Sequence, residues 1–169
     1  MAAPTSPLQI RPHESAISEA EAQLAWVEQS QAVMVAVDAA GAAVGTYYLR
    51  PNSLALGAHV ANAGYVVAEH CRRQGVGSRL CQHSLQAARR LGFRAMQFNL
   101  VSTNTAGLRC WQRNGFQVVG TLPGAFRHRQ LGDVDALCPG HVPVLVGGAQ
   151  WMKAVSGCSS QEAGSFSLR

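Results

Sequence analysis

The sequence predicts one α+β domain in which helices flank a central sheet, and three observations favour this fold class. Two apolar, β-branched segments at 32–37 and 42–49 are joined by the turn residues of 38–41, a pattern typical of a β-hairpin. A β-loop-α-β unit follows over 59–101, and a helix with a further strand occupies 104–122. A chain of 169 residues with 47% hydrophobic residues is long enough for one packed core.

The first part of the chain has one clear helix signal. Residues 1–7 are expected to form a flexible leader, and 8–11 a short strand that ends at Pro12. Ser18 is a typical N-cap, and the acidic residues that follow it complement the helix dipole. The sequence therefore predicts a helix over 18–29.

The β-loop-α-β unit is predicted from a change of hydrophobic period. The strand 59–68 leads into a polar loop, and apolar residues then recur at helical spacing over 76–91. Gly92 is a typical helix end. Apolar side chains alternate over 95–101, which predicts one strand there.

A second helix and strand follow. Asn104 begins a helix that runs to about Arg113 and is stopped by Asn114 and Gly115, and 116–122 returns as a strand. No internal repeat is present in this order of helices and strands.

Charge and cysteine content argue against several classes of protein. Fourteen Lys and Arg against nine Asp and Glu give a net charge of +5, which suits an anionic partner. The basic residues are scattered and not interleaved with aromatic residues, so no nucleic-acid partner is expected. The five cysteines include no CxxC pair and the histidines lack ligand spacing, so neither a disulfide framework nor a metal site is indicated.

The chain shows no secretory or membrane signal. Its N-terminus lacks a basic region followed by an apolar one, and no window approaches the ~20 apolar residues of a membrane span. We expect a cytoplasmic protein without a membrane partner.

The segment RRQGVGS, residues 72–78, is the first candidate for a binding site. It lies between a predicted strand and a predicted helix, where the unpaired N–H groups of a helix N-terminus favour an anion. Gly75 and Gly77 remove the Cβ atoms that would keep a diphosphate from these amides, while two arginines add charge. The alternative is that the glycines only shape a turn. A Walker loop and a dinucleotide fingerprint are excluded, because their further residues are missing.

Two segments resemble a known family. VVAEHCRRQGVGSRL resembles motif A of the GNAT acetyltransferases, whose fixed places are filled by Arg72, Gly75 and Gly77. NTAGLRCWQRNGF, which begins at Asn104, is similar to motif B of that family. The resemblance covers about residues 32–137, and YYLRPN, HVANAGYVV, FRAMQFNLV and LPGAFRH resemble the branch that includes the proline-analogue (azetidine-2-carboxylate) acetyltransferases.

The resemblance implies the GNAT fold, with a mixed, mostly antiparallel sheet, and an N-acetyltransferase that uses acetyl-CoA and no metal. The acceptor would be the amine of a small molecule or peptide, attacking directly in a ternary complex. In the family, the strand before the loop splays from its neighbour, and its main chain holds the pantetheine arm and polarises the thioester carbonyl. The residues implied in binding acetyl-CoA are Tyr65, Val66, Val67, Arg72, Arg73, Gln74, Gly75, Val76, Gly77, Ser78, Asn104 and Trp111.

The sequence fixes no catalytic residue, and Glu69 and Trp111 are the two candidates. The family often has a tyrosine at the position of Trp111 to protonate the departing thiolate, which an indole N–H cannot do near neutral pH. Trp111 then either contacts the cofactor or is a core residue. Glu69 is either a general base or an ordinary surface glutamate, and a water relay is an equal alternative. Asn104 is explained by an N-cap alone or also by a contact to the CoA arm.

The resemblance assigns the acceptor pocket to four residues. Asn62 and Asn99 lie on adjacent predicted strands, with satisfied buried amides as the alternative. Tyr48 lies on the hairpin and Arg127 follows the strand 116–122, so both border the pocket. Arg127 would bind an acidic acceptor, or else is simply solvated.

The two ends of the chain depart from the family. Few residues separate the first strand from the hairpin, so the acceptor side should have fewer helices than usual. Where the branch continues a hydrophobic strand, this chain has Pro139, and proline weakens a central strand. We therefore expect the acetyltransferase domain at 8–137 and a divergent, partly disordered tail at 138–169, with 142–146 as an alternative last strand.

Two other functions stay open. The first is a non-catalytic acyl-CoA-binding sensor of the same fold, favoured by the absent tyrosine. The second, ranked last, is a small nucleic-acid-binding domain. The sequence does not identify the acceptor amine or the oligomeric state, for which a homodimer is one option.

Overall fold

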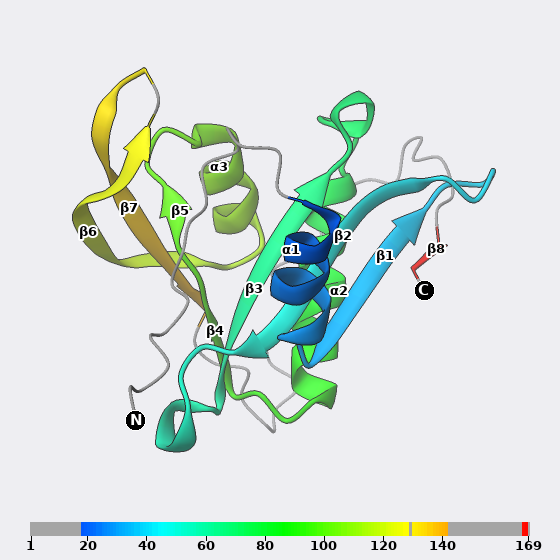
Figure 1. Ribbon diagram of the computed structural model, residues 1–169, viewed down its shortest axis with the longest axis horizontal. Coiled ribbons are helices and arrows are strands. Elements are labelled where there is room, and N and C mark those ends of the chain that lie inside the picture. The colour runs from blue at the N-terminus through cyan, green and yellow to red at the C-terminus, as the bar shows by residue number, and fades with distance from the viewer. Residues whose placement is uncertain (1–17, 129, 142–166, 169) are drawn as a thin grey trace.

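The computed structural model describes residues 18–128, 130–141 and 167–168 (Figure 1). Its centre is an eight-stranded sheet in the order β5-β7-β4-β3-β2-β1-β8, with β6 paired to β7. The β3–β4 pair is parallel and the others are antiparallel. This confirms the predicted α+β class, a mixed and mostly antiparallel sheet flanked by helices. The predicted leader 1–7, the strand 8–11 and the alternative strand 142–146 lie outside the described residues.

The elements follow one another in a mixed order. They are α1 Glu19–Ala22, η1 Gln23–Glu28, β1 Ala32–Val37, β2 Ala43–Pro51, η2 Ala55–Gly57, β3 Val60–Val67, η3 Glu69–Cys71, α2 Val76–Arg90, β4 Ala95–Gln97, β5 Leu100–Val101, α3 Thr105–Arg113, β6 Gln117–His128, β7 Gly132–His141 and β8 Ser167–Leu168.

The first helix starts as the sequence predicts and then changes type. The Ser18 hydroxyl accepts a hydrogen bond from the Glu21 N–H at 3.2 Å, and the Glu21 carboxylate accepts one from the Ser18 N–H at 3.0 Å. This capping box pairs two N–H groups that a helix leaves free. The predicted helix over 18–29 is confirmed, and beyond Ala22 it continues as the π-helix η1.

The hairpin and its neighbour form the regular part of the sheet. β1 and β2 pair antiparallel, and the Asp38 carboxylate closes the turn by accepting from the N–H groups of Ala40 and Ala42, each at 2.9 Å. β2 then pairs with β3 from Gly45↔Val67 to Pro51↔Ala61. A single register of this length fixes which side chains share each face of the sheet.

The predicted single strand 95–101 is wrong, because it is split into β4 and β5. Both pieces pair with β7 in one register, Gln97 opposite Gly140 and Leu100 opposite Leu137. The two pairs missing between them are those opposite Cys138 and Pro139. Proline has no N–H to donate to the ladder, so the interruption falls beside it. The predicted alternation is still correct, since Met96, Phe98 and Leu100 are buried.

β6 is longer than the sequence predicts, and β7 is a strand that the sequence analysis did not predict. β6 passes the predicted end at residue 122 and reaches His128, with irregular pairing between Leu122 and Phe126. In that stretch Gly124 has a φ of +59° and donates its N–H to the Asp135 carboxylate at 3.0 Å. β7 runs on to His141, so the predicted domain end at 137 falls inside this strand.

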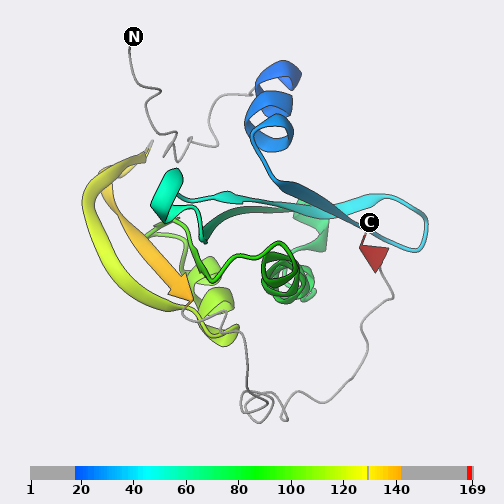
Figure 2. The same ribbon diagram turned by 90° about the horizontal axis from the view of Figure 1, so that it is seen from below.

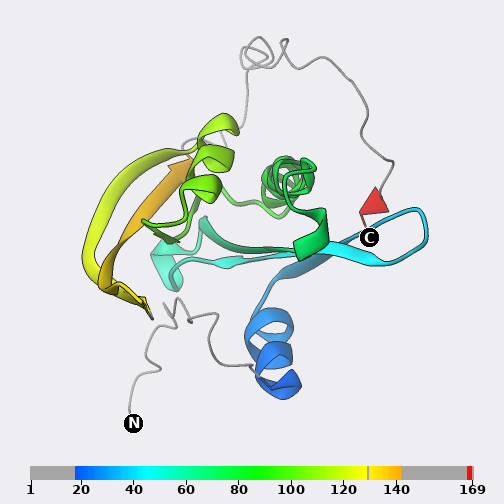
Figure 3. The same cartoon turned by 90° about the horizontal axis from the view of Figure 1, so that it is seen from above.

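The two faces of the sheet are covered differently. Seen along the sheet, α1 lies on one face, while α2 and α3 lie on the other, and the β6–β7 pair curves away at one end (Figure 2, Figure 3). The core lies between the sheet and α2, where Tyr47, Leu49, Leu80, Cys81 and Ala88 are fully buried. One short helical segment, α1 with η1, precedes the hairpin in the described part of the chain.

Candidate active site

The site begins where β3 and β4 separate. These strands pair only at Val60 and Ala61, although β3 continues to Val67. In the β2–β3 ladder the Asn52 N–H donates to the Val60 carbonyl at 2.8 Å, and the Ala68 N–H donates to the Val44 carbonyl at 3.0 Å.

These two bonds set the direction of every main-chain group on β3. Because hydrogen-bonded pairs alternate in an antiparallel ladder, even-numbered residues of β3 turn their main chain toward β2. The N–H and C=O groups of Ala63, Tyr65 and Val67 therefore face the side from which β4 has departed. Tyr65, Val66 and Val67 are expected from the sequence to bind acetyl-CoA, but the main chain of Val66 turns toward β2.

The loop after β3 leads into an uncapped helix N-terminus. Arg73 and Gly75 have φ angles of +64° and +79°, which turn the chain into α2. Within the described ranges, no side chain caps the N–H groups at the start of α2. A Cβ on Gly75 would meet no atom within 4 Å, and one on Gly77 would lie 3.8 Å from the Cys110 sulfur and 3.9 Å from Val67. The start of α2 thus meets the end of β3 and the middle of α3, with open space in front of Gly75.

The polar side chains of the loop point in several directions. Arg72 lies 3.7 Å from the Glu69 carboxylate, and both side chains are exposed. Gln74 donates to the His70 carbonyl at 2.8 Å, back along the loop. Glu69 therefore lies at the loop surface beside a cation.

One serine and one asparagine connect α2 to α3. The Asn114 amide donates to the Ser78 hydroxyl at 3.0 Å and to the Cys110 carbonyl at 2.8 Å. The sequence predicts Asn114 only as a helix stop, because its contact with α2 depends on tertiary packing. Asn104 is the N-cap of α3 and accepts from the Gly107 N–H at 2.9 Å.

An aromatic cluster closes the space between α3 and β3. Trp111 is only 8% exposed, and its ring centroid lies 4.4 Å from that of Tyr65 and 5.1 Å from that of Phe98. The Trp111 indole nitrogen is buried and has no hydrogen-bond partner among the described residues. The Tyr65 hydroxyl is 2.7 Å from the Ser84 hydroxyl, and burial raises the pKa of Tyr65 well above its ordinary value. Trp111 is a core residue that also lies against the strand bordering the gap.

The opposite face of β3 carries a polar cluster. Asn62 donates to the Asn52 side chain at 3.0 Å and accepts from the Tyr48 hydroxyl at 3.3 Å. Arg50 lies across from Asn62 in the ladder, and its guanidinium is 4.8 Å from the centroid of the Tyr48 ring. Trp26 of η1 contacts the same ring edge-on at 4.7 Å. Burial raises the pKa of Tyr48, while Arg50 opposes that change, so the phenol stays a neutral donor near pH 7.

Two predicted acceptor residues lie apart from this cluster. Asn99 lies between β4 and β5, and its carbonyl oxygen is 3.5 Å from the Cys138 sulfur. Arg127 on β6 donates from Nε to the Asp133 carboxylate at 3.0 Å, and both side chains are exposed.

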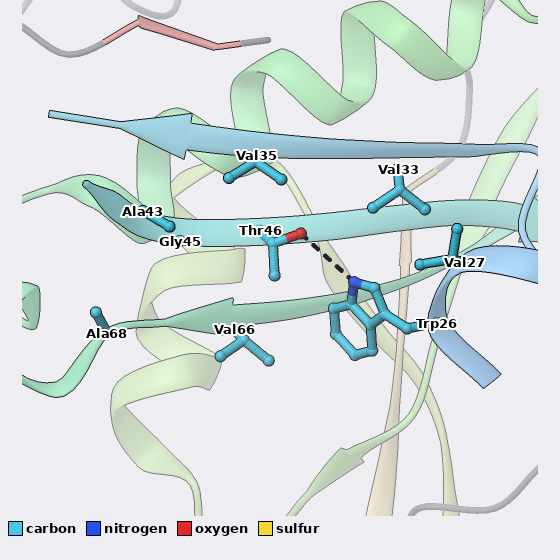
Figure 4. Close-up of a pocket in the computed structure, with 9 residues that line it drawn as sticks. All are labelled: Trp26, Val27, Val33, Val35, Ala43, Gly45, Thr46, Val66 and Ala68. Atoms are coloured by element: carbon cyan, nitrogen blue, oxygen red, sulfur yellow. Dashed lines mark hydrogen bonds between the residues drawn. The ribbon is translucent and has the colours of Figure 1, made fainter. Parts of the chain in front are cut away.

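An open apolar groove continues along the same face, beside η1 (Figure 4). Its volume is about 380 Å³, and its walls include Trp26, Val33, Val35 and Val66. Thr46 lies at its centre and accepts a hydrogen bond from the Trp26 indole at 3.4 Å. Apolar side chains and a polar cluster therefore adjoin on this face.

Comparison with known proteins identifies the family. The model of the Acetyltransferase (GNAT) family matches residues 4–116. The chain belongs to this family. The match confirms the resemblance predicted from the sequence.

Individual GNAT proteins agree with this assignment. The N-acetyltransferase aca1 of Schizosaccharomyces pombe is 36% identical over 95 residues, which are 55% of this chain and 46% of that protein. The chain thus matches about half the length of this curated relative. A GCN5-related N-acetyltransferase from Kribbella flavida is 37% identical with a TM-score of 0.71, covering 79% of this chain and 81% of that one. A phosphinothricin acetyltransferase from Sinorhizobium meliloti, solved with acetyl-CoA, has a TM-score of 0.68 at 20% identity, covering 76% and 71%, and shows the same fold.

Two further findings concern ligands and membranes. The described residues contain no group of three or more His, Cys, Asp or Glu side chains that could hold a metal ion. No helix in the described part of this GNAT chain is long and apolar enough to cross a membrane.

Arg50 is a residue of the polar cluster that sequence reasoning missed. The signal lies in the YYLRPN segment, where Tyr48 and Arg50 are two residues apart on a strand and so share a face. Their position beside Asn62 depends on the β2–β3 register, which the sequence alone does not give.

Proposed function

We propose that the protein transfers an acetyl group from acetyl-CoA to the amine of a small molecule or peptide, by direct attack in a ternary complex in the cytoplasm. The observation that supports this most is the uncapped N-terminus of α2 at the open edge of β3. The solved complex of the Sinorhizobium meliloti neighbour with acetyl-CoA supports the choice of co-substrate.

The residues around the α2 N-terminus suit the diphosphate of CoA. A helix N-terminus binds anions through free N–H groups and its dipole, and here Val76, Gly77 and Ser78 supply those groups. The open space at Gly75 lets an anion approach the amides, and the exposed guanidinium of Arg72 adds positive charge.

The open edge of β3 suits the thioester end of the same molecule. The main-chain groups of Ala63, Tyr65 and Val67 face the gap. In the proposed complex they bind the pantetheine amides, and one of their N–H groups donates to the thioester carbonyl. Donors fixed in a strand need no reorganisation as negative charge develops on that oxygen. The bound thioester supplies an activated acetyl group: the amine forms a bond to the carbonyl carbon, the C–S bond breaks, CoA leaves as thiolate, and the amine loses a proton.

The side chains near the gap limit the acid–base chemistry. The Trp111 indole can donate a hydrogen bond but cannot act as a general acid. CoA then leaves as a thiolate without protonation, which is feasible because a thiol has an ordinary pKa near ~8.5. Glu69 stays a predicted base, and its exposure beside Arg72 makes a water relay equally suitable. Positioning of amine and thioester then accounts for most of the rate.

The decisive experiment compares the two ends of α2. Gly75 and Gly92 flank this helix with φ angles of +79° and +85°, and a Cβ on either would meet no atom within 4 Å. Gly75→Ala and Gly92→Ala should therefore each lower the unfolding free energy by about 1 kcal/mol through left-handed strain. Only Gly75→Ala places a methyl group in front of the amides, and we expect it to weaken acetyl-CoA binding about tenfold, or about 1.4 kcal/mol.

Titration calorimetry with acetyl-CoA gives the affinities, and thermal unfolding gives the stabilities. Equal acetyl-CoA affinities in the two variants would contradict the loop assignment. A panel of amines assayed for thiol release then separates the enzyme from the sensor. Binding of acetyl-CoA without thiol release from any amine would favour the sensor.

A further inference from the structure

Arg50 is a half-buried cation on the α1 face of the sheet, and it has no acidic partner among the described residues. Its Nη1 is 3.5 Å from the side-chain amide oxygen of Gln29 and its Nη2 is 3.4 Å from the Tyr48 hydroxyl, two long contacts to neutral groups. The ion pairs between described residues join Arg72 to Glu69 and Arg127 to Asp133, and neither includes Arg50. A guanidinium has five donors in a fixed fork that matches a carboxylate, so most of its capacity is unused here.

Arg127, the arginine that the sequence analysis assigns to an acidic acceptor, already has an acidic partner. Arg127 is exposed and donates to Asp133 at 3.0 Å, which raises the pKa of its guanidinium. An arginine that already holds a carboxylate must lose that contact before it binds another. Arg50 has no such contact to lose among the described residues, and its guanidinium lies over the ring of Tyr48.

The position of Arg50 connects it to the proposed reaction. Asn62 pairs with Arg50 across the β2–β3 ladder, directly after Ala61, the last residue of β3 that pairs with β4. The next residue, Ala63, is the first whose main chain faces the gap. A molecule held at Arg50 and Asn62 would therefore have its other end beside the open edge of β3.

The side chains around Arg50 add donors without adding negative charge. Tyr48, Asn52 and Asn62 form a hydrogen-bonded chain of neutral groups beside the guanidinium. Such a surrounding favours an anionic group over a cationic one, because among these four described residues the formal charge is the positive one of Arg50. A planar carboxylate can accept two parallel bonds from the guanidinium.

We propose that Arg50 binds the carboxylate of the acceptor, so that the acceptor class is an amino acid or a close analogue whose amine is placed at the open edge of β3. This assignment rests on the proposed acetyl transfer. It makes Arg50, with Tyr48 and Asn62 beside it, the determinant that selects an acidic acceptor from other amines.

The test compares pairs of acceptors that differ only in charge. Free amino acids, including L-proline and azetidine-2-carboxylate, are assayed beside their carboxamides for thiol release from acetyl-CoA. We expect the wild-type protein to prefer the carboxylate member of its best pair, and Arg50→Met to lower this preference in kcat/KM by about tenfold or more, as expected on losing one charge-assisted hydrogen bond. Arg50→Lys, which keeps the charge but not the fork, should retain part of the preference.

Arg90→Met is the matched control, since it removes the same charge from an exposed side chain at the far end of α2. It should leave the carboxylate preference unchanged, and thermal unfolding verifies that all variants fold. A wild-type protein that treats both members alike, or an Arg50→Met variant that keeps the full preference, would overturn the assignment.

Failure of the acetyl transfer itself gives a different result. In that case no amine releases thiol. Calorimetric titration of the same acceptor pairs into the protein, with CoA present, then tests whether Arg50 binds a carboxylate, independently of acetyl transfer. Carboxylate binding that is lost in Arg50→Met supports the site, and absence of any carboxylate binding to the wild-type protein contradicts it.

Discussion

The two faces of the sheet differ in how their sites are built. On the α2–α3 face, the loop and the N-terminus of α2 form one contiguous segment, 72–78, and an aromatic cluster from distant parts of the chain lies near it. On the α1 face, the polar cluster joins residues of η1, β2 and β3 that meet only through strand register. The first arrangement can be recognised as a motif, whereas the second becomes visible only when the strands are paired.

The same difference extends to packing. Trp111 on the α2–α3 face is surrounded by the rings of Tyr65, Phe98 and Phe116. Trp26 on the α1 face is half-buried beside an open groove, with one ring contact and one hydrogen bond. The α2–α3 face is therefore closely packed around Trp111, whereas the α1 face is more open around Trp26.

Truncating the two tryptophans should give the largest effects and tests whether the faces differ in packing. Trp111→Ala leaves a cavity among aromatic rings and should lower the unfolding free energy by about 3–5 kcal/mol. Trp26→Ala removes a half-buried ring whose place water can enter, and we expect a loss of about 1–2 kcal/mol. Urea denaturation of both variants measures the difference. Equal losses would show that the α1 face is packed as tightly as the other.

A conservative change at the same position separates packing from chemistry. Trp111→Phe keeps an aromatic ring but removes the indole N–H, which has no partner among the described residues. If this group donates to the sulfur of the departing CoA, kcat should fall about tenfold while the KM for acetyl-CoA stays unchanged. Trp26→Phe is the control on the other face, where the lost indole bonds Thr46, and it should leave kcat within about twofold. An unchanged kcat in Trp111→Phe would limit Trp111 to a packing role.

The local elements of the fold could be predicted from the sequence because their signals are local. Ser18 as a cap, the turn at Asp38 and the helix spacing of α2 each depend on residues within a few positions of one another. The loop at 72–78 is also predicted from a local signal, because its glycines and the helix that follows it are adjacent in the sequence.

The remaining features depend on contacts between distant residues. The break between β4 and β5 arises from Pro139, about forty residues further along the chain, and no pattern within 95–101 reveals it. Asp135 binds the Gly124 N–H and so holds β6 together beyond the predicted end of that strand. Arg50 likewise becomes a candidate binding residue only through its pairing with Asn62.

The smallest expected effect is on the pH dependence of stability, and it concerns a hydrogen-bonded pair on the α2 face, Tyr47 and His83. The Tyr47 hydroxyl lies 2.7 Å from Nδ1 of His83. Burial lowers the pKa of His83, helped by the charge of Arg90, and burial raises the pKa of Tyr47 to about 12. Both groups are thus favoured as neutral in the folded protein. The stability that they add is complete between the unfolded-state pKa values of about 6.5 and 10, and it is lost as the pH falls below the first or rises above the second.

Replacing His83 should therefore flatten only the acid side of the stability profile. In His83→Gln we expect the melting temperature to fall less between pH 7 and pH 5 than in the wild-type protein, whereas Tyr47→Phe should flatten the decline above pH 10 instead. The substitution removes only part of the decline at acid pH. Burial also lowers the pKa of His141, so protonation of that histidine destabilises the folded protein over the same pH range. It is also small, since His83 is partly exposed and solvent screens its charge. An acid profile unchanged by His83→Gln would mean that the pair contributes packing rather than a titrating contact.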